Sequence, residues 1–142
     1  MKPVSELFKN RPTTLWSVSP GDTVFEAIKV LAEKGVGALM VMDKGKLVGI
    51  VSERDYTRKI ALQSKNSRET PVREIMTQNV FVVNPQTRTR QCMAIMAEKN
   101  IRHLPVVDGN TVVGMLSIRD LMNDIIQDHE ITIAQLESYI HS

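Results

Sequence analysis

The sequence predicts an α/β (α+β) fold of two β-α-β-β-α repeats, packed around a pseudo-two-fold axis and followed by a C-terminal helix. Two observations support this prediction. Residues 48–55 read VGIVSERD and residues 113–120 read VGMLSIRD, so one strand-to-helix junction occurs twice. Before each junction, hydrophobic residues follow helical and then strand spacing in the same order. Because one small sheet cannot bury both of its faces, we expect the repeats to pack against each other.

The repeat extends beyond these junctions. Shifting the chain by 65 positions aligns residues 20–55 with residues 85–120 in 36 ungapped pairs. Twelve pairs are identical, and their first members are Pro20, Ala32, Glu33, Lys34, Leu39, Val41, Asp43, Val48, Gly49, Ser52, Arg54 and Asp55. The predicted organisation is repeat 1 at 1–62, a polar linker at 63–70, repeat 2 at 71–126 and a helical tail at 127–142.

Each repeat predicts the same elements. In chain order these are a helical turn (4–8 and 72–76), a strand (15–18 and 80–83), a helix opened by a proline (Pro20 and Pro85), two strands joined by a tight turn (38–42 with 47–51, and 104–107 with 112–116) and a second helix after Ser-x-x-Asp. Gly35 and Asn100 are placed to end the first helices in the left-handed conformation.

The tail beyond residue 126 has a helical pattern of its own. Ile131, Ile133, Leu136 and Ile140 can lie along one side of a helix. We expect this helix to pack on its own domain, and a helix that faces a partner is the alternative.

Composition limits the class of protein. A hydrophobic content of 42% is ordinary for a globular chain. The net charge is only +2 and the basic residues are dispersed, so nucleic-acid binding is not expected. Cys92 is the only cysteine, which excludes an intrachain disulfide. With neither a signal-peptide pattern nor a long apolar run, the sequence predicts a soluble cytoplasmic protein without membrane association.

Catalytic motifs are not evident. Cys92 falls within a predicted helix among apolar residues, which is typical of an inert thiol. His103, His129 and His141 lack metal-ligand spacing, and neither a P-loop nor G-x-G-x-x-G occurs. We therefore predict that the protein is not an enzyme and has no metal site or catalytic cofactor.

The repeated pattern resembles a known family. V-x-E-hydrophobic-M, x-V-x-P, hydrophobic-x-A/H-L-x-V-V-D and G-hydrophobic-hydrophobic-S-x-x-D are similar to motifs of the cystathionine-β-synthase (CBS) domain, here as a tandem pair over residues 2 to 126. The chain resembles the small stand-alone CBS-pair proteins of bacteria. The resemblance implies a regulatory module that senses AMP, ADP, ATP, S-adenosylmethionine or NAD(H) in clefts between the repeats. It also implies a homodimer and an effector protein of unknown identity.

The Ser-x-Arg-Asp turns are the strongest candidate binding residues. A carboxylate has two acceptor oxygens that match the two hydroxyl donors of a ribose, and Asp55 and Asp120 stand at the starts of helices. Ser52 and Ser117 lie three residues earlier and can join the same clefts. Ser-x-x-Asp is also a helix capping box, and the serine can serve both purposes.

Each cleft is expected to combine both repeats, as in the family. The first would pair Val18, Ser19, Val36, Gly37 and Ala38 with Met115, Ser117, Arg119 and Asp120. The second would pair Val83, Asn84, Ile101, Arg102 and His103 with Ile50, Ser52, Arg54 and Asp55. Gly37 and Ala38 leave room for a base, whereas Arg102 and His103 suit the second cleft to phosphates. The alternative is that Arg102 is a solvated charge at a strand edge and that His103 is a half-buried packing residue. Arg54 and Arg119 either bind phosphate or face solvent.

Three functions remain open, of which the third, nucleic-acid binding, is only weakly allowed by a sequence pI of about 8.8. The first is an adenine-nucleotide sensor, with two separate ligands or one dinucleotide spanning both clefts. The alternative is a ligand-independent interaction module that acts through a dimer surface and the tail helix.

Overall fold

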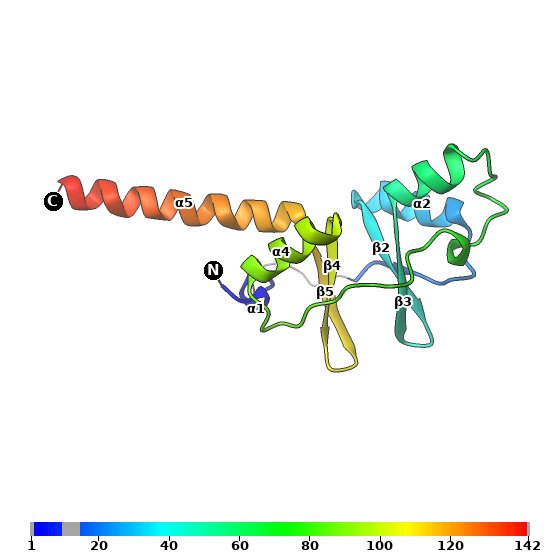
Figure 1. The fold of residues 1–142 in the computed structure, drawn as a ribbon, viewed down its shortest axis with the longest axis horizontal. Coiled ribbons are helices and arrows are strands. Elements are labelled where there is room, and N and C mark those ends of the chain that lie inside the picture. The colour runs from blue at the N-terminus through cyan, green and yellow to red at the C-terminus, as the bar shows by residue number, and fades with distance from the viewer. Residues whose placement is uncertain (1, 10–14, 142) are drawn as a thin grey trace.

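The structure is a computed structural model that describes residues 2–9 and 15–141. Two small bodies of sheet and helix lie beside each other, and a long helix extends from one end (Figure 1). The elements are α1 (Val4–Leu7), β1 (Ser17–Val18), α2 (Val24–Lys34), β2 (Ala38–Asp43), β3 (Lys46–Ser52), α3 (Glu53–Tyr56), η1 (Thr57–Ala61), η2 (Val72–Glu74), α4 (Thr89–Lys99), β4 (His103–Asp108), β5 (Thr111–Ser117) and α5 (Ile118–His141). The mixed α/β class, the two repeats and the C-terminal helix are as predicted.

The sheets differ in size although the repeats are related. Strands β1, β2 and β3 form a three-stranded sheet, with β1 parallel to β2 and β2 antiparallel to β3. Strands β4 and β5 form an antiparallel pair. The predicted strand at 80–83 is reduced to a single parallel bridge between Val83 and Val106. In the hairpin of repeat 1, Lys44 and Gly45 have positive φ angles of 51° and 77°, as the predicted tight turn requires.

The first helix of each repeat begins later than predicted. Helix α2 starts at Val24, and the Thr23 side chain accepts a hydrogen bond from the Glu26 amide at 3.1 Å. Pro20 precedes this cap in a turn in which the Asp22 carboxylate accepts from the Ser19 amide. Both prolines therefore lie in turns before the helices: in repeat 1 the capping residue Thr23 follows Pro20, and in repeat 2 helix α4 begins only at Thr89. The predicted left-handed helix ends at Gly35 and Asn100 are confirmed, with φ angles of 64° and 54°.

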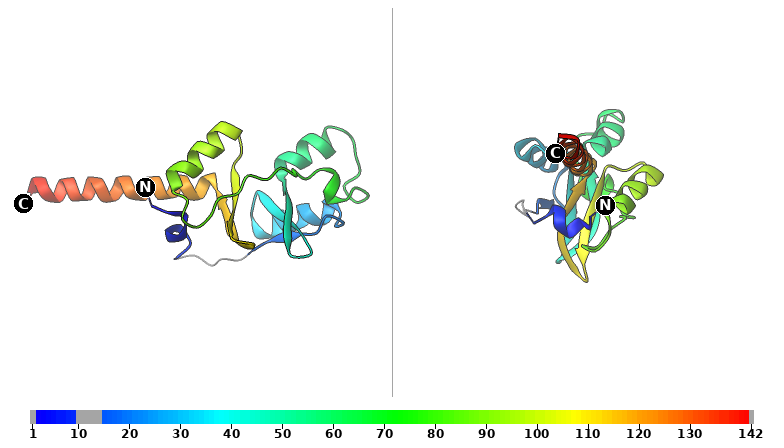
Figure 2. Two further views of the ribbon diagram at one scale, coloured as in Figure 1. Left: turned by 60° about the horizontal axis from the view of Figure 1, so that its bottom comes forward. Right: turned by 90° about the vertical axis from the view of Figure 1, so that its left-hand side faces the viewer.

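The leading segments are exchanged between the two cores. Val4 packs in the core of repeat 2, with Cys92, Leu104 and other apolar residues, and its amide donates to the Thr87 carbonyl at 2.9 Å. Reciprocally, Val72 packs in the core of repeat 1. Each folded body thus contains one segment from the other sequence repeat, so the two repeats are interlocked (Figure 2).

The C-terminal helix does not follow the predicted packing. Helix α5 is continuous from the Ser-x-x-Asp turn to the tail and projects past the body of repeat 2 (Figure 1). Ile131, Ile133, Leu136 and Ile140 are 55–75% exposed, so the expectation that the tail packs on its own domain is wrong. Among the described residues, none of the helices has the length and hydropathy needed to cross a membrane.

Candidate functional site: two clefts between the repeats

Two cavities lie where the repeats meet. Cleft 1 has a volume of about 880 Å³ and cleft 2 about 550 Å³. Of the predicted residues, cleft 1 is lined by Val36, Gly37, Ala38, Met115, Ser117, Arg119 and Asp120. Cleft 2 is lined by Ile50, Ser52, Arg54, Asp55, Ile101, Arg102 and His103. The structure therefore brings each Ser-x-x-Asp turn together with residues of the opposite repeat.

Both Ser-x-x-Asp turns form capping contacts. Asp120 Oδ2 accepts hydrogen bonds from the Ser117 amide at 2.8 Å and from Ser117 Oγ at 3.0 Å, and the Asp120 amide donates to Ser117 Oγ at 3.2 Å. The turn of Ser52 and Asp55 has the same contacts at 2.9, 3.0 and 3.2 Å. Capping fixes the orientation of each carboxylate at the wall of its cleft. Because an ionised carboxylate has about four lone-pair sites, a cap leaves acceptor capacity for a ligand.

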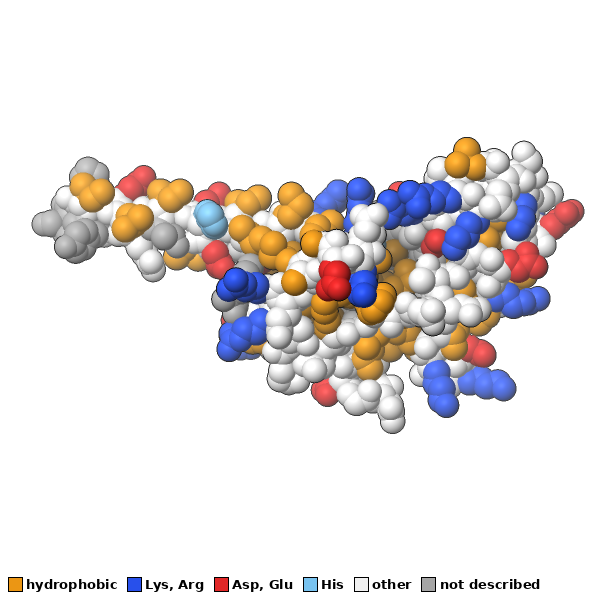
Figure 3. All heavy atoms as spheres, viewed as in Figure 1, with side chains coloured by type: hydrophobic (Ala, Val, Ile, Leu, Met, Phe, Trp, Pro, Cys, Tyr) orange, Lys and Arg blue, Asp and Glu red, His pale blue; other side chains and the backbone are white. Residues whose placement is uncertain are grey.

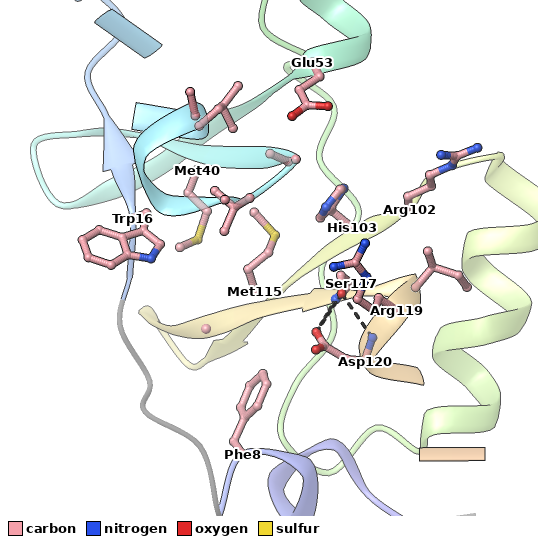
Figure 4. Close-up of a pocket in the computed structure, with 18 residues that line it drawn as sticks. Phe8, Trp16, Met40, Glu53, Arg102, His103, Met115, Ser117, Arg119 and Asp120 are labelled. Atoms are coloured by element: carbon pink, nitrogen blue, oxygen red, sulfur yellow. Dashed lines mark hydrogen bonds between the residues drawn. The ribbon is translucent and has the colours of Figure 1, made fainter. Parts of the chain in front are cut away.

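Cleft 1 has an apolar side and a polar side. Figure 4 shows Trp16, Met40 and Met115 on one side of the space. His103 and Arg119 lie on the other side, near the Ser117–Asp120 turn. This arrangement can hold a molecule that has a flat apolar part and a hydroxylated or charged part.

Arg102 and His103 do not belong to the second cleft alone. Together with Gly37 and Glu53 they line both clefts, which makes them a shared partition. The predicted contrast between the clefts is therefore incorrect in this respect. The geometric reason is that β4 begins at the boundary between the repeats, where the His103 ring faces Gly37. Burial lowers the pKa of His103 below its ordinary value of 6.5, and the nearby Asp120 carboxylate partly opposes this effect.

The clefts differ instead in residues that the repeat analysis overlooked. Cleft 2 adds Arg58 and Lys59, and Lys59 Nζ lies 3.1 Å from Asp55 Oδ1. Arg54 also lines cleft 2, and its guanidinium donates to the Asn100 carbonyl at 3.3 Å. In cleft 1 the corresponding wall is more apolar and includes Ile118. Cleft 2 is thus the more cationic of the two.

Four predicted residues line neither cleft. Val18 and Val83 are only 8% and 6% exposed and belong to the two cores. Ser19 lies in the turn before α2, whereas Val83 and Asn84 border a separate open hollow of about 580 Å³. We therefore exclude these four residues from the candidate site. In both repeats the aromatic residue two positions before the valine lines the cleft instead.

These aromatic residues are Trp16 in cleft 1 and Phe81 in cleft 2. They are 65 positions apart, the same shift that relates the repeats. Lys34 lies over the Trp16 ring, 4.3 Å from its centroid, and Lys99 lies 5.1 Å from the centroid of Phe81. Lys34 and Lys99 are themselves an identical pair of the repeat. Extending the ungapped alignment four residues toward the N-terminus would have revealed the aromatic pair.

The environment of Cys92 does not support a role as a nucleophile. Cys92 is buried, and its burial raises the pKa of the thiol to about 11. A thiol with such a pKa is almost entirely protonated at neutral pH. Within residues 2–9 and 15–141, His, Cys, Asp and Glu side chains do not gather in threes as a metal site would require.

Comparison with known proteins identifies the family. The family model described as "CBS domain" matches residues 4–62 and again residues 72–127. The chain belongs to the CBS family. Among curated relatives, the CBS domain-containing protein CBSX3, mitochondrial, of Arabidopsis thaliana is 37% identical over 131 residues, covering 89% of this chain and 63% of that protein. The chain thus spans less than two thirds of that relative.

Solved CBS structures share most of the fold. A CBS-domain protein from Burkholderia ambifaria MC40-6 is 46% identical with a TM-score of 0.87, covering 89% of this chain and 96% of that one. The CBS domain pair of protein MJ0100 is 25% identical with a TM-score of 0.79, covering 90% of this chain and 98% of that one. The MJ0100 structure is a complex with 5′-methylthioadenosine and S-adenosyl-L-methionine.

Proposed function

We propose that this CBS pair is a regulatory module that binds adenosyl ligands in its two clefts. The observation that carries the proposal is that each cleft combines a capped Ser-x-x-Asp turn and cationic side chains with an aromatic ring from the opposite repeat. The adenosyl compounds bound to the MJ0100 CBS pair support this class of ligand. AMP, ADP, ATP, NAD and S-adenosylmethionine are the candidates to test.

A single pose uses all three features. The ribose hydroxyls donate to Asp120 in cleft 1 or to Asp55 in cleft 2, which is a charge-assisted contact. The adenine stacks on Trp16 or Phe81, since every base offers a π-face to an aromatic ring. The 5′ substituent then extends toward the Arg102–His103 partition between the clefts.

The clefts should prefer different 5′ substituents. Cleft 2 has Arg54, Arg58 and Lys59 in addition to the partition, so it should favour phosphorylated ligands such as AMP or ATP. Cleft 1 has Met40 and Met115 in its wall, so it should tolerate an uncharged or thioether substituent. A ligand can regulate only if it binds two states of the pair with different affinity. The interlocked repeats and a homodimer offer such states, which an effector protein would recognise.

A thermal-shift screen tests the proposal. Nucleotide-free protein would be heated with each adenine ligand and with GTP, using wild type, Asp55→Asn and Asp120→Asn. Asparagine keeps the shape of the side chain and an acceptor for the cap but removes the charge. Ligand at 100 times its Kd should stabilise by about 2.7 kcal/mol, which corresponds to a Tm increase of roughly 5–10 °C.

Asp22→Asn is the matched control. Its carboxylate also accepts a backbone amide three residues away, at 2.9 Å, but it lies outside both clefts. We expect it to retain the full ligand-induced shift, while each cleft variant loses the shift at its own cleft. Absence of any shift with every adenine ligand would contradict the proposal and favour a ligand-independent interaction module.

A further inference from the structure

The exposed apolar stripe of α5 carries an inference that is independent of ligand binding. Met122, Ile126, Ile133, Leu136 and Ile140 are each 53–75% exposed. With His129 they form a series, spaced alternately four and three residues apart, that we call the α5 stripe. Figure 3 shows hydrophobic side chains along the projecting helix. This spacing is the heptad pattern of a coiled coil.

The stripe keeps to one side of the helix. Met122 and Ile140 are eighteen residues apart, which equals five turns of 3.6 residues. Ile131 is nine residues from Met122, about two and a half turns, and therefore lies on the opposite side. The predicted grouping of Ile131 with Ile133 on one side is thus corrected. One narrow seam of large apolar residues remains.

The tail lacks packing within its own protomer. From His129 to Ile140, every side chain that the structure describes is exposed. A helix in a protein owes most of its stability to packing of its amphipathic face, and a short isolated helix is only marginally stable in water. A partner helix that covered the α5 stripe would supply this stabilisation.

The charges beside the stripe favour a second copy in parallel orientation. Glu130 and Glu137 occupy one flank of the stripe, whereas Ile125 on the other flank is uncharged. In a parallel pair each flank faces the opposite flank of its partner, so the two glutamate flanks do not face each other. In an antiparallel pair the glutamate flanks would face each other and repel.

We propose that residues 122–140 of α5 form a parallel two-stranded coiled coil with the same segment of a second copy. Because both helices then run in the same direction, the two CBS pairs would lie at the same end of the assembly. His129 occupies an inward position in the middle of the seam, where a leucine would pack better.

The test is the oligomeric state of the full, ligand-free chain. Sedimentation equilibrium should show a dimer for wild type. Ile133→Glu places two like charges in the seam and should weaken the dimer at least about 100-fold, while the Tm of the CBS body stays unchanged. Ile131→Glu is the matched control, because the two isoleucines are 56% and 55% exposed but lie on different sides of the helix. It should remain dimeric, and His129→Leu should dimerise more tightly.

Orientation is tested by cross-linking. In a parallel pair, the cysteine of Ile140→Cys lies opposite the cysteine at position 140 of the second copy. It should therefore form an intermolecular disulfide on oxidation, while Ile131→Cys should not. The buried Cys92 does not interfere. A monomeric wild type, or a dimer unaffected by Ile133→Glu, would overturn the proposal. A dimer in which position 140 fails to cross-link would overturn its parallel arrangement.

Discussion

Trp16 and Phe81 occupy equivalent positions in the two repeats, and each lines a different cleft beneath the equivalent lysine. If each ring stacks on an adenine, Trp16→Ala should weaken cleft 1 alone and Phe81→Ala should weaken cleft 2 alone. Loss of one stacked base costs about 1–3 kcal/mol, or roughly 5- to 150-fold in Kd. Calorimetric titration with AMP and S-adenosylmethionine would measure both sites.

Phe25→Ala provides the control for this pair. Phe25 is 37% exposed, as is Trp16, and it also has a cation over its ring, that of Arg68 at 4.0 Å. It does not line either cleft. Equal losses of affinity in all three variants would indicate a general structural effect and would refute stacking.

The exchanged leading segments make two equivalent glycines unequal. A Cβ added at Gly49 would lie 2.9 Å from the Thr77 carbonyl oxygen, which also accepts the Ile50 amide. A Cβ added at Gly114 would meet the Phe8 ring at 3.0 Å, and a side-chain ring can move more easily than a bonded backbone. Gly49→Ala should therefore cost about 1–3 kcal/mol of unfolding free energy and Gly114→Ala less. Urea denaturation would measure both, and a larger cost at Gly114 would contradict this account.

An ion pair holds the N-terminal segment on α5. Lys2 Nζ lies 2.6 Å from Asp124 Oδ1, and the Asp124 side chain is only 1% exposed. Lys2→Met would leave a buried carboxylate without its partner, which should lower the unfolding free energy by about 1–3 kcal/mol. Lys2→Met/Asp124→Leu should recover part of this loss. No recovery in the double variant would argue against the ion pair as the cause.

The same ion pair predicts that the unfolding free energy changes at alkaline pH. The hydrogen bond to Asp124 raises the pKa of Lys2 above its ordinary value of 10.5. A raised folded-state pKa contributes stability in full below 10.5, and that stability is lost as the pH rises through the folded-state value. Wild type should therefore lose more stability than Lys2→Met above this pH, as measured by denaturant titration. Parallel curves for the two proteins would contradict the prediction.

The burial of His103 predicts that the unfolding free energy changes at mildly acidic pH. Its folded-state pKa is lowered below 6.5 by burial, so the unfolded state binds the proton more readily. The unfolding free energy should therefore decrease as the pH falls below about 6.5. His103→Asn should flatten this decrease. If the unfolding free energy of His103→Asn decreased with falling pH as steeply as that of wild type, His103 would not be the cause of the decrease.

The sequence predicted the parts of the site that the repeat encodes locally. Both Ser-x-x-Asp turns were found because their contacts lie within four residues. Val18 was misplaced because Trp16 and Val18 fall on one face of the predicted strand at 15–18, and alternation does not tell which of the two side chains lines the cleft. The exchange of Val4 and Val72 and the sharing of Arg102 depend on tertiary contacts, which local spacing does not contain.

The most direct test of the central claim uses the fluorescence of Trp16. It is the only tryptophan in the chain and it lines cleft 1, so its emission reports on that cleft. We predict a saturable change on titration with an adenosyl ligand, shifted about 10-fold or more to higher concentration by Asp120→Asn and unchanged by Asp55→Asn. Identical titrations in wild type and Asp120→Asn, or no response to any adenosyl ligand, would contradict the assignment of cleft 1 as an adenosyl site.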